Sequence, residues 1–329
     1  MNKAITDSIK FICCIGIFIH HFYLHSPYVE FLGPTACVIF FFLSAYGISV
    51  SLEKKPMALL PFIKKRLFKI YLPLLMINTL FILGTGLLCK GYFSIPIFNV
   101  FGDNIDFVQN VSTLDLFLYI VGIYKIDGVT WFLNVLFAMY LFLWFIHKMA
   151  NKTQRIIVTT IAYSIFVIGC INITPPVMFG LIFDPWGIVI GVLFAEKKQL
   201  IEYIQSRITT KLIILIGIIV FTLGFLMGTM QNIEGRYTKL ILLIVAVSSI
   251  IFTTALATGK PTKKFSSIST FLGGISFFVY LTHEKIANIV FYFRGSSSLV
   301  LTSIGICIIS VVLYLFYQKI IKKDIWLKL

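Results

Sequence analysis

The sequence predicts an all-α, polytopic membrane protein with about ten transmembrane helices and both termini in the cytoplasm. Three observations support this. Of the 329 residues, 59% are hydrophobic and only 12% are charged, which leaves too little polar surface to cover a soluble domain. Apolar runs long enough to cross a bilayer recur along the chain. Lys and Arg gather between alternate runs. We expect one integral membrane domain over residues 1–329.

Ten apolar windows define the expected helices. They run approximately over residues 7–25, 32–52, 67–89, 131–147, 156–172, 175–195, 210–229, 238–258, 267–284 and 298–318. With the N-terminus inside, six of the 28 Lys and Arg residues fall outside: Lys90, Lys125, Arg236, Lys239, Lys285 and Arg294. The remaining 22 fall on the cytoplasmic side, an asymmetry that favours this orientation. Topology thus explains the net charge of +15, and we expect no nucleic-acid partner.

The longest loop, about 90–130, lies on the extracytoplasmic side in this topology. Its segment 113–124 is apolar but short and carries Asp115. A span here would move fourteen later Lys and Arg residues outside, so we expect an interfacial or re-entrant piece. The loop is either a functional lid or a disordered connection.

The six cysteines lie in or beside apolar runs without zinc-site spacing, so we expect neither a metal nor a disulfide framework.

The first span carries two ionisable residues on one helical face. Lys10 and His21 are eleven residues apart, almost three turns or roughly 16 Å along the axis. Ionisable groups at this depth are costly and rarely face lipid. Since histidine titrates near neutral pH and can take a proton from a hydroxyl, His21 is a candidate catalytic base. The alternative is a solvated interfacial cluster. His20, about 100° away on the helix, is the secondary candidate; Cys14, Ile17 and His25 continue the His21 face.

A cationic cluster opens the third span. Lys65 and Arg66 precede Tyr71 by a few residues. Ordinary positive-inside anchoring explains such a cluster. The functional alternative is a phosphate contact, because Arg offers bidentate hydrogen bonds and Lys a point charge. Lys10 and Arg66 are both expected at the cytoplasmic surface, where together they would bind a phosphorylated cytosolic ligand.

Other polar or aromatic residues lie within the predicted spans, and a structural interpretation is available for most of them. Ser44 and Gly47, on either side of Tyr46, suit close helix packing. Trp131 starts the fourth span, where an aromatic anchor is expected. Asp184 is an acid within a predicted span and needs a partner.

The ninth span ends in Tyr280-Leu-Thr-His283-Glu284-Lys285. His283 beside Glu284 is either a proton relay or an exposed loop end. The sequence contains no Walker loop, GxSxG elbow, HExxH or GxGxxG motif, which removes support for ATP-driven pumps.

Taken in order, these motifs resemble the acyltransferase 3 family of integral membrane acyltransferases. The family's first helix carries a basic residue, ten intervening residues and a His, which Lys10 and His21 match, although many members have Arg first. The later matches are Phe41-Phe42-Leu43-Ser44-Ala45-Tyr46, with Ala45 at a usual Gly, Lys65-Arg66…Tyr71-Leu72-Pro73, Trp131-Phe132-Leu133 and Tyr280-Leu281-Thr282-His283. The resemblance covers almost the whole chain.

The resemblance implies transfer of an acyl group, usually acetyl, from cytosolic acyl-CoA to a hydroxyl of a carbohydrate or lipid-linked glycan at the outer side. It places the protein in the cytoplasmic membrane, in polysaccharide O-acetylation and cell-envelope biogenesis. Acetyl-CoA would be the donor, without a metal, and membrane lipid would surround the chain. The resemblance leaves open whether the chain forms a homo-oligomer.

The resemblance also implies roles for individual residues. Lys10 and Arg66 would hold CoA phosphates, with Lys65 and Tyr71 beside them. His21 would act as the base, and a transient acyl-histidine stays open as an alternative. The supporting residues would be Ser44, Tyr46, Trp131, Tyr280 and His283. Two rival classes are a transporter or exporter of a glycan or small molecule, and a structural partner in a cell-envelope assembly.

Overall fold

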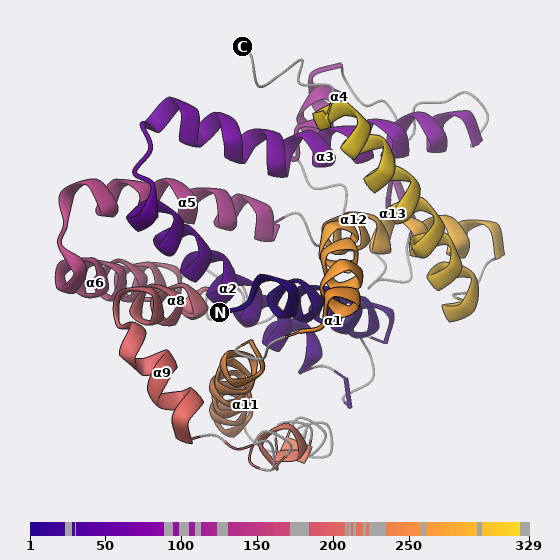
Figure 1. The fold of residues 1–329 in the computed structure, drawn as a ribbon. Coiled ribbons are helices and arrows are strands. Elements are labelled where there is room, and N and C mark those ends of the chain that lie inside the picture. Colours follow the sequence, from indigo (N-terminus) through magenta and orange to yellow (C-terminus); the bar gives the residue numbers. More distant parts are fainter. Residues whose placement is uncertain are drawn as a thin grey trace. The chain divides into compact units, whose positions relative to one another are not determined.

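The computed structural model describes residues 1–23, 28–29, 31–88, 95–98, 105–108, 113–123, 131–171, 184–207, 209, 212, 215–219, 222–223, 235–257, 261–294 and 298–322. His25 and most of the predicted span 210–229 lie outside these residues. The chain forms two compact units, Met1–Leu59 with Val135–Gly273, and Leu60–Asn134 with Gly274–Leu329. Two of the unit boundaries fall inside α5 (Trp131–Met149) and α12 (Lys263–Arg294), which are labelled in Figure 1. The single domain over 1–329 stays a prediction.

Helices dominate the described part of the chain. They are α1 (Lys3–Phe22), α2 (Leu32–Lys54), α3 (Leu59–Leu88), α4 (Thr113–Ile120), α5 (Trp131–Met149), α6 (Lys152–Ile171), α8 (Trp186–Glu196), α9 (Lys198–Arg207), α11 (Gly235–Leu256), α12 (Lys263–Arg294) and α13 (Leu299–Lys322). Among the described residues, six helices are long and apolar enough to cross a membrane: α1, α2, α3, α5, α12 and α13. This confirms a helical membrane protein; the count of ten and the orientation of the termini stay predictions.

The outer surface of α13 has the composition expected of a lipid-facing helix. Val300, Ile304, Ile308 and Val312 recur every four residues and are each more than half exposed. Such a row lies along one helical face. A continuous apolar face of this kind is unusual on a soluble monomer, so it supports a membrane environment.

Helix α2 is the centre of the first unit and contacts α1, α8 and α11. Its closest neighbour is α8, which begins just after Asp184 and carries Gly187 and Gly191 four residues apart. A Cβ at Gly187 would overlap the carbonyl oxygen of Val38 in α2. One at Gly191 would lie 2.6 Å from the carbonyl oxygen of Phe42. The absence of side chains at these two positions lets the helix backbones touch.

Helix α1 runs antiparallel to α2. At its start, the Met1 amino group donates a hydrogen bond to the Tyr46 hydroxyl over 3.4 Å. Near its end, the His20 ring covers Gly33, where a Cβ would lie 2.5 Å from the ring. The two contacts fix which end of α1 meets which end of α2.

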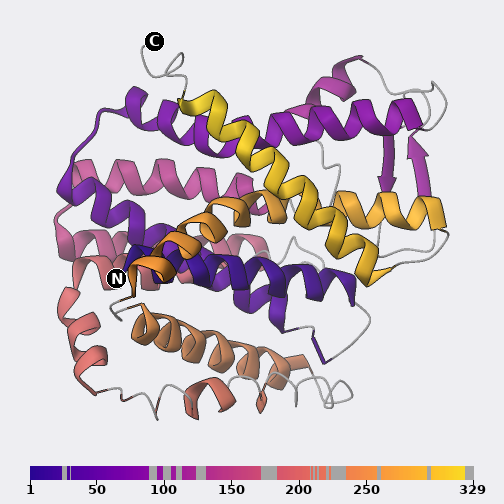
Figure 2. The same cartoon turned by 45° about the vertical axis from the view of Figure 1, so that its right-hand side comes forward.

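In the second unit, the predicted long loop contains secondary structure. Strands β1 (Ile95–Phe98) and β2 (Ile105–Val108) pair antiparallel, with Ile95 opposite Val108 (Figure 2). The described residues are thus helical apart from this two-stranded hairpin, which the sequence pattern did not predict. The sequence windows missed the hairpin because each strand has only four residues.

Helix α4 occupies the ambiguous apolar segment and is too short to span a membrane. Its eight residues rise about 12 Å. Asn78 of α3 donates hydrogen bonds to the carbonyl oxygens of Tyr119 (3.1 Å) and Ile120 (3.2 Å), and so satisfies acceptors at the helix end. Gly122 then adopts φ +76°, a left-handed conformation that ends the helix. The segment does not add a span.

Candidate active site

The predicted polar face of α1 is turned into the protein. Cys14 and Ile17 are 1% and 2% exposed, whereas Ile12 on the other side is 63% exposed. Lys10 is half-buried and forms an ion pair with Asp7, Nζ to Oδ1, at 3.4 Å. The charge of Lys10 therefore has a nearby counter-charge, which sequence reasoning did not anticipate.

The two histidines lie at the far end of this face. Both His20 and His21 are half-buried, and their rings contact edge to face with centroids 5.1 Å apart. The His20 ring lies directly over Gly33 of α2, and any larger residue at position 33 would collide with the ring. The His20 ring thus packs against a neighbouring helix and against the His21 ring, and the catalytic roles expected of the two histidines stay predictions.

The predicted motif of α2 contributes mainly to packing. Ala45 is fully buried and lies against Gly191 of α8, where an added Cβ would come within 2.8 Å of its own. Ser44 is half-buried on the adjacent position. Tyr46 accepts the hydrogen bond from the chain terminus. Close approach of α8 explains why a small residue occupies position 45.

The cationic entry to α3 places its residues differently from one another. Lys65 is exposed, whereas Arg66 is half-buried with its guanidinium 5.3 Å from the Phe62 ring centroid. Tyr71 donates a hydrogen bond over 3.4 Å to Asn134, one turn into α5. Lys10 belongs to the first unit and Arg66 to the second, so their joint binding of one phosphorylated ligand stays a prediction.

Helix α12 continues well past its expected end at residue 284. Tyr280, His283, Glu284 and Lys285 are all at most 5% exposed, inside a helix that reaches Arg294. The reading of His283 as an exposed loop end, with Lys285 in the outer loop, is therefore wrong. Hydropathy windows stop at these polar residues, but the helix continues because its backbone hydrogen bonds do not depend on side-chain polarity.

This part of α12 contacts two other helices of its unit. The Tyr280 ring packs edge to face on Phe132 of α5, with centroids 5.6 Å apart. His283 Nδ1 lies 2.7 Å from the Tyr280 carbonyl oxygen, and therefore donates to it. The Lys285 ammonium lies 5.9 Å from the centroid of the Phe81 ring in α3. The Trp131 and Tyr280 motifs, 149 positions apart in the sequence, thus meet through Phe132, which follows Trp131.

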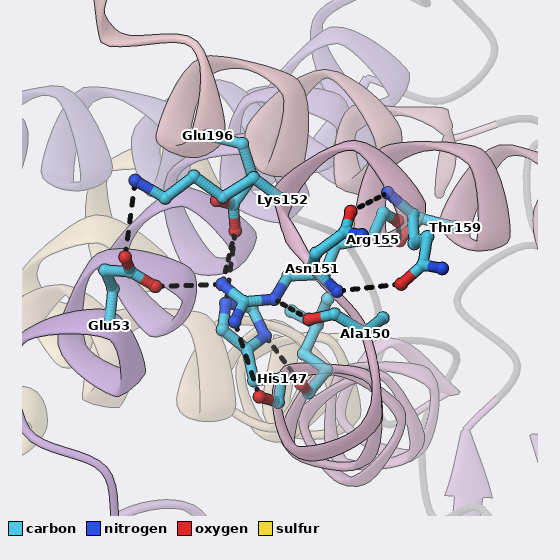
Figure 3. A network of polar contacts seen from close by, with 10 residues as sticks. Glu53, His147, Ala150, Asn151, Lys152, Arg155, Thr159 and Glu196 are labelled. Carbon is cyan, nitrogen blue, oxygen red and sulfur yellow. Dashed lines mark hydrogen bonds and ion pairs between the residues drawn. The ribbon is translucent and has the colours of Figure 1, made fainter.

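A second polar cluster, which no sequence motif indicated, ties four helices of the first unit together (Figure 3). The Arg155 guanidinium of α6 bridges Glu53 of α2 at 2.9 Å and Glu196 of α8 at 3.1 Å. It also donates to the carbonyl oxygens of Ala150 (2.9 Å) and His147 (3.4 Å) at the end of α5. We call these residues the Arg155 network.

The network leaves its most buried charges compensated. The side chains of Glu196 and His147 are 3% and 5% exposed and lie 3.4 Å apart, Oε1 to Nε2. Burial raises the pKa of the Glu196 carboxyl, but His147 and Arg155 outweigh it and hold that pKa below its usual value. Since the buried Glu196 carboxylate has the Arg155 guanidinium as its opposite charge, the cluster joins helix ends without leaving an isolated buried ion.

Local sequence explains how the network is positioned. Asn151 and Gln154 exchange hydrogen bonds between side chain and backbone amide, both of 3.0 Å, which is a capping box at the start of α6. This cap sets the first turn of α6, from which Arg155 points back to α5. A residue-type count placed Arg155 only among the cytoplasmic charges, and the Asn-x-x-Gln pattern was the signal that could have located the helix start.

The comparisons with known proteins agree with these motifs. A family model described as "Acyltransferase domain" (Acyl_transf_3) matches residues 4–317. A protein of Acidianus two-tailed virus, named "Putative acetyltransferase ORF330", is 25% identical over 203 residues. The aligned region covers 56% of this chain and 58% of that protein. No solved structure matches the chain.

Proposed function

The chain belongs to the acyltransferase 3 family, and from this premise we propose that it transfers an acetyl group from cytosolic acetyl-CoA to a hydroxyl of an extracytoplasmic or lipid-linked carbohydrate. The observation that carries the proposal is the family match over nearly the whole chain. The chain spans a little over half of the acetyltransferase-named relative, so donor, acceptor and site are parts of the proposal. The proposed location is the cytoplasmic membrane.

In the proposed mechanism, His21 is the general base. It takes the proton of the acceptor hydroxyl, whose oxygen attacks the thioester carbonyl. The C–S bond then breaks, the acetyl ester forms, and the leaving CoA thiolate receives the proton from the imidazolium. The half-buried position of His21 beside His20 supports this role, because it combines access for substrate with a fixed ring. Positioning both substrates supplies a large part of the rate.

Lys10 is the proposed donor anchor on α1, about 16 Å from His21 along the helix axis. That separation allows one extended ligand to contact a cation at one end and a base at the other. Asp7 weakens the attraction of Lys10 for a phosphate, because its carboxylate already pairs with the Lys10 ammonium. Arg66, Lys65 and Tyr71 stay proposed donor contacts from α3.

The experiment compares acetyl release from radiolabelled acetyl-CoA by the purified chain and by His21→Ala. The matched control is Ile12→Ala, a truncation on the exposed side of the same helix. We expect the turnover of His21→Ala to be at least a hundredfold lower than that of the wild type, and the turnover of Ile12→Ala to be unchanged. Full turnover in His21→Ala would refute the catalytic role.

The same experiment addresses the alternative classes. Donor binding with turnover in neither the wild type nor the variants would contradict acyl transfer under these conditions. Absence of acetyl-CoA binding by any of the proteins would favour transport or a structural role. A radiolabelled protein adduct lost in His21→Ala would favour the acyl-histidine route.

A further inference from the structure

The first unit contains a cavity of about 150 Å³ beside the Arg155 network. Its lining includes Met57, Trp144, Glu53, His147, Lys148 and Arg155. The Trp144 indole donates a 2.8 Å hydrogen bond to the Met57 carbonyl oxygen, and the Lys148 ammonium lies 6.0 Å from the centroid of the indole ring. The cavity thus has an ordered aromatic wall with a cation beside it.

This cavity is remote from the proposed active site. Glu53 lines the cavity at one end of α2, and Gly33, twenty residues earlier, contacts His20 at the other. Twenty residues of helix extend about 30 Å, the full thickness of a bilayer's hydrocarbon core. A ligand in the cavity therefore does not reach the histidine pair, and the cavity needs its own explanation.

The charge around the cavity favours an anion. The exposed cations of these helix ends are Lys54, Lys55, Lys148, Lys152, Lys197 and Lys198. The two nearby carboxylates, Glu53 and Glu196, are already bound by Arg155, and Lys152 adds a second partner for Glu53 at 3.4 Å. The lysines are thus in excess, which makes the local potential positive.

His147 lines the cavity, and both of its ring nitrogens face the protein. His147 Nδ1 donates to the Leu143 carbonyl oxygen over 2.8 Å. Its Nε2 is buried and, among the described residues, approaches Glu196 at 3.4 Å without completing a hydrogen bond. Recognition of an anion therefore rests on Lys148 and the lysines around the cavity, and His147 forms part of its wall.

The mixed lining selects an amphiphile over a free ion. Trp144 and Met57 give the cavity an apolar wall, and Trp is the residue most typical of the membrane interface. Basic pockets between transmembrane helices on the cytoplasmic side bind the phosphate groups of anionic lipids. We propose that this cavity binds the phosphate headgroup of an anionic phospholipid, from the leaflet at the Lys-rich ends of α2, α5 and α6.

The test titrates the purified full-length chain with phosphatidylglycerol or phosphatidylcholine and follows bound lipid by native mass spectrometry. The variants are Lys148→Gln, which removes a cavity cation, and Lys197→Gln, a control that removes an exposed cation outside the lining. We expect phosphatidylglycerol to bind more tightly than phosphatidylcholine. Lys148→Gln should weaken phosphatidylglycerol binding about fivefold. Lys197→Gln removes only a part of the surrounding potential and should weaken it clearly less.

Three results would overturn the proposal. The first is equal binding of the two lipids, and the second is equal weakening by both lysine variants. The third comes from an arm with inorganic phosphate and ADP: saturable binding of either, lost in Lys148→Gln and without lipid preference, would assign the cavity to a soluble phosphate. None of these readouts involves acetyl transfer, so failure here is independent of the catalytic proposal.

Discussion

Replacing Gly191 with Ala tests the contact between α2 and α8 that holds the first unit together. The new Cβ would lie 2.6 Å from the Phe42 carbonyl oxygen and 2.8 Å from the Ala45 Cβ. Non-bonded carbons prefer about 3.5–4.0 Å. Because one obstacle is backbone, a side-chain rotation does not relieve it, and α8 must move away from α2.

The magnitude follows from a matched pair of variants. Gly47 lies in α2, and a Cβ there meets nothing within 4 Å. Both substitutions gain the same helix propensity, about 1 kcal/mol, so their difference isolates the overlap. Overpacking of a well-packed contact costs about 1–3 kcal/mol. We expect Gly191→Ala to be about 2 kcal/mol less stable than Gly47→Ala.

The assay is thermal unfolding of the purified chain in one detergent, followed by loss of the monodisperse peak in size-exclusion chromatography. Gly47→Ala should melt at or slightly above the wild type, and Gly191→Ala several degrees below it. Adding Ala45→Gly to Gly191→Ala removes the contact with the Ala45 Cβ and should recover part of the lost melting temperature. The recovery is partial because the contact with the Phe42 carbonyl oxygen remains. Equal melting of the two single variants would refute the close backbone contact.

Two further predictions concern charged pairs. Glu196 has a depressed pKa in the folded state, so its stabilising contribution is present above the unfolded pKa, about 4.3, and is lost as pH falls through the folded pKa. Melting temperatures measured from pH 6 to pH 3 should therefore decline more steeply for the wild type than for Glu196→Gln, and parallel curves would contradict this. Removing the carboxylate that pairs with Lys10, by Asp7→Asn, should tighten acetyl-CoA binding about two- to fivefold, measured by equilibrium dialysis at low salt. Unchanged or weaker binding would mean that Lys10 is not a donor contact.

The sequence determined the features that depend on local pattern. Apolar length predicted that α1, α2 and α13 would be membrane helices, since a bilayer sets one minimum length. The 3.6-residue period predicted which side of α1 is buried, and Cys14 and Ile17 lie on that side. Motif order was enough to suggest the family that the comparison confirmed.

Sequence pattern was a poor guide where polar residues are buried inside a long helix. Hydropathy ended the ninth span at Glu284, although α12 continues to Arg294. The residues around His283 are polar yet buried, and burial is decided by neighbouring helices that a sequence window does not contain. The short strands of the hairpin gave no signal above the surrounding loop.

Only the tertiary structure decided which distant residues meet. Gly191 and Phe42 touch across about 150 positions of sequence, and their contact depends on the register of two packed helices. Arg155 gave a charge to the topology count, but its partners Glu53 and Glu196 come from α2 and α8. A sequence specifies each helix through short-range periodicity, whereas the pairing of helix faces arises from side-chain shape and charge compensation, which act only once the chain is folded.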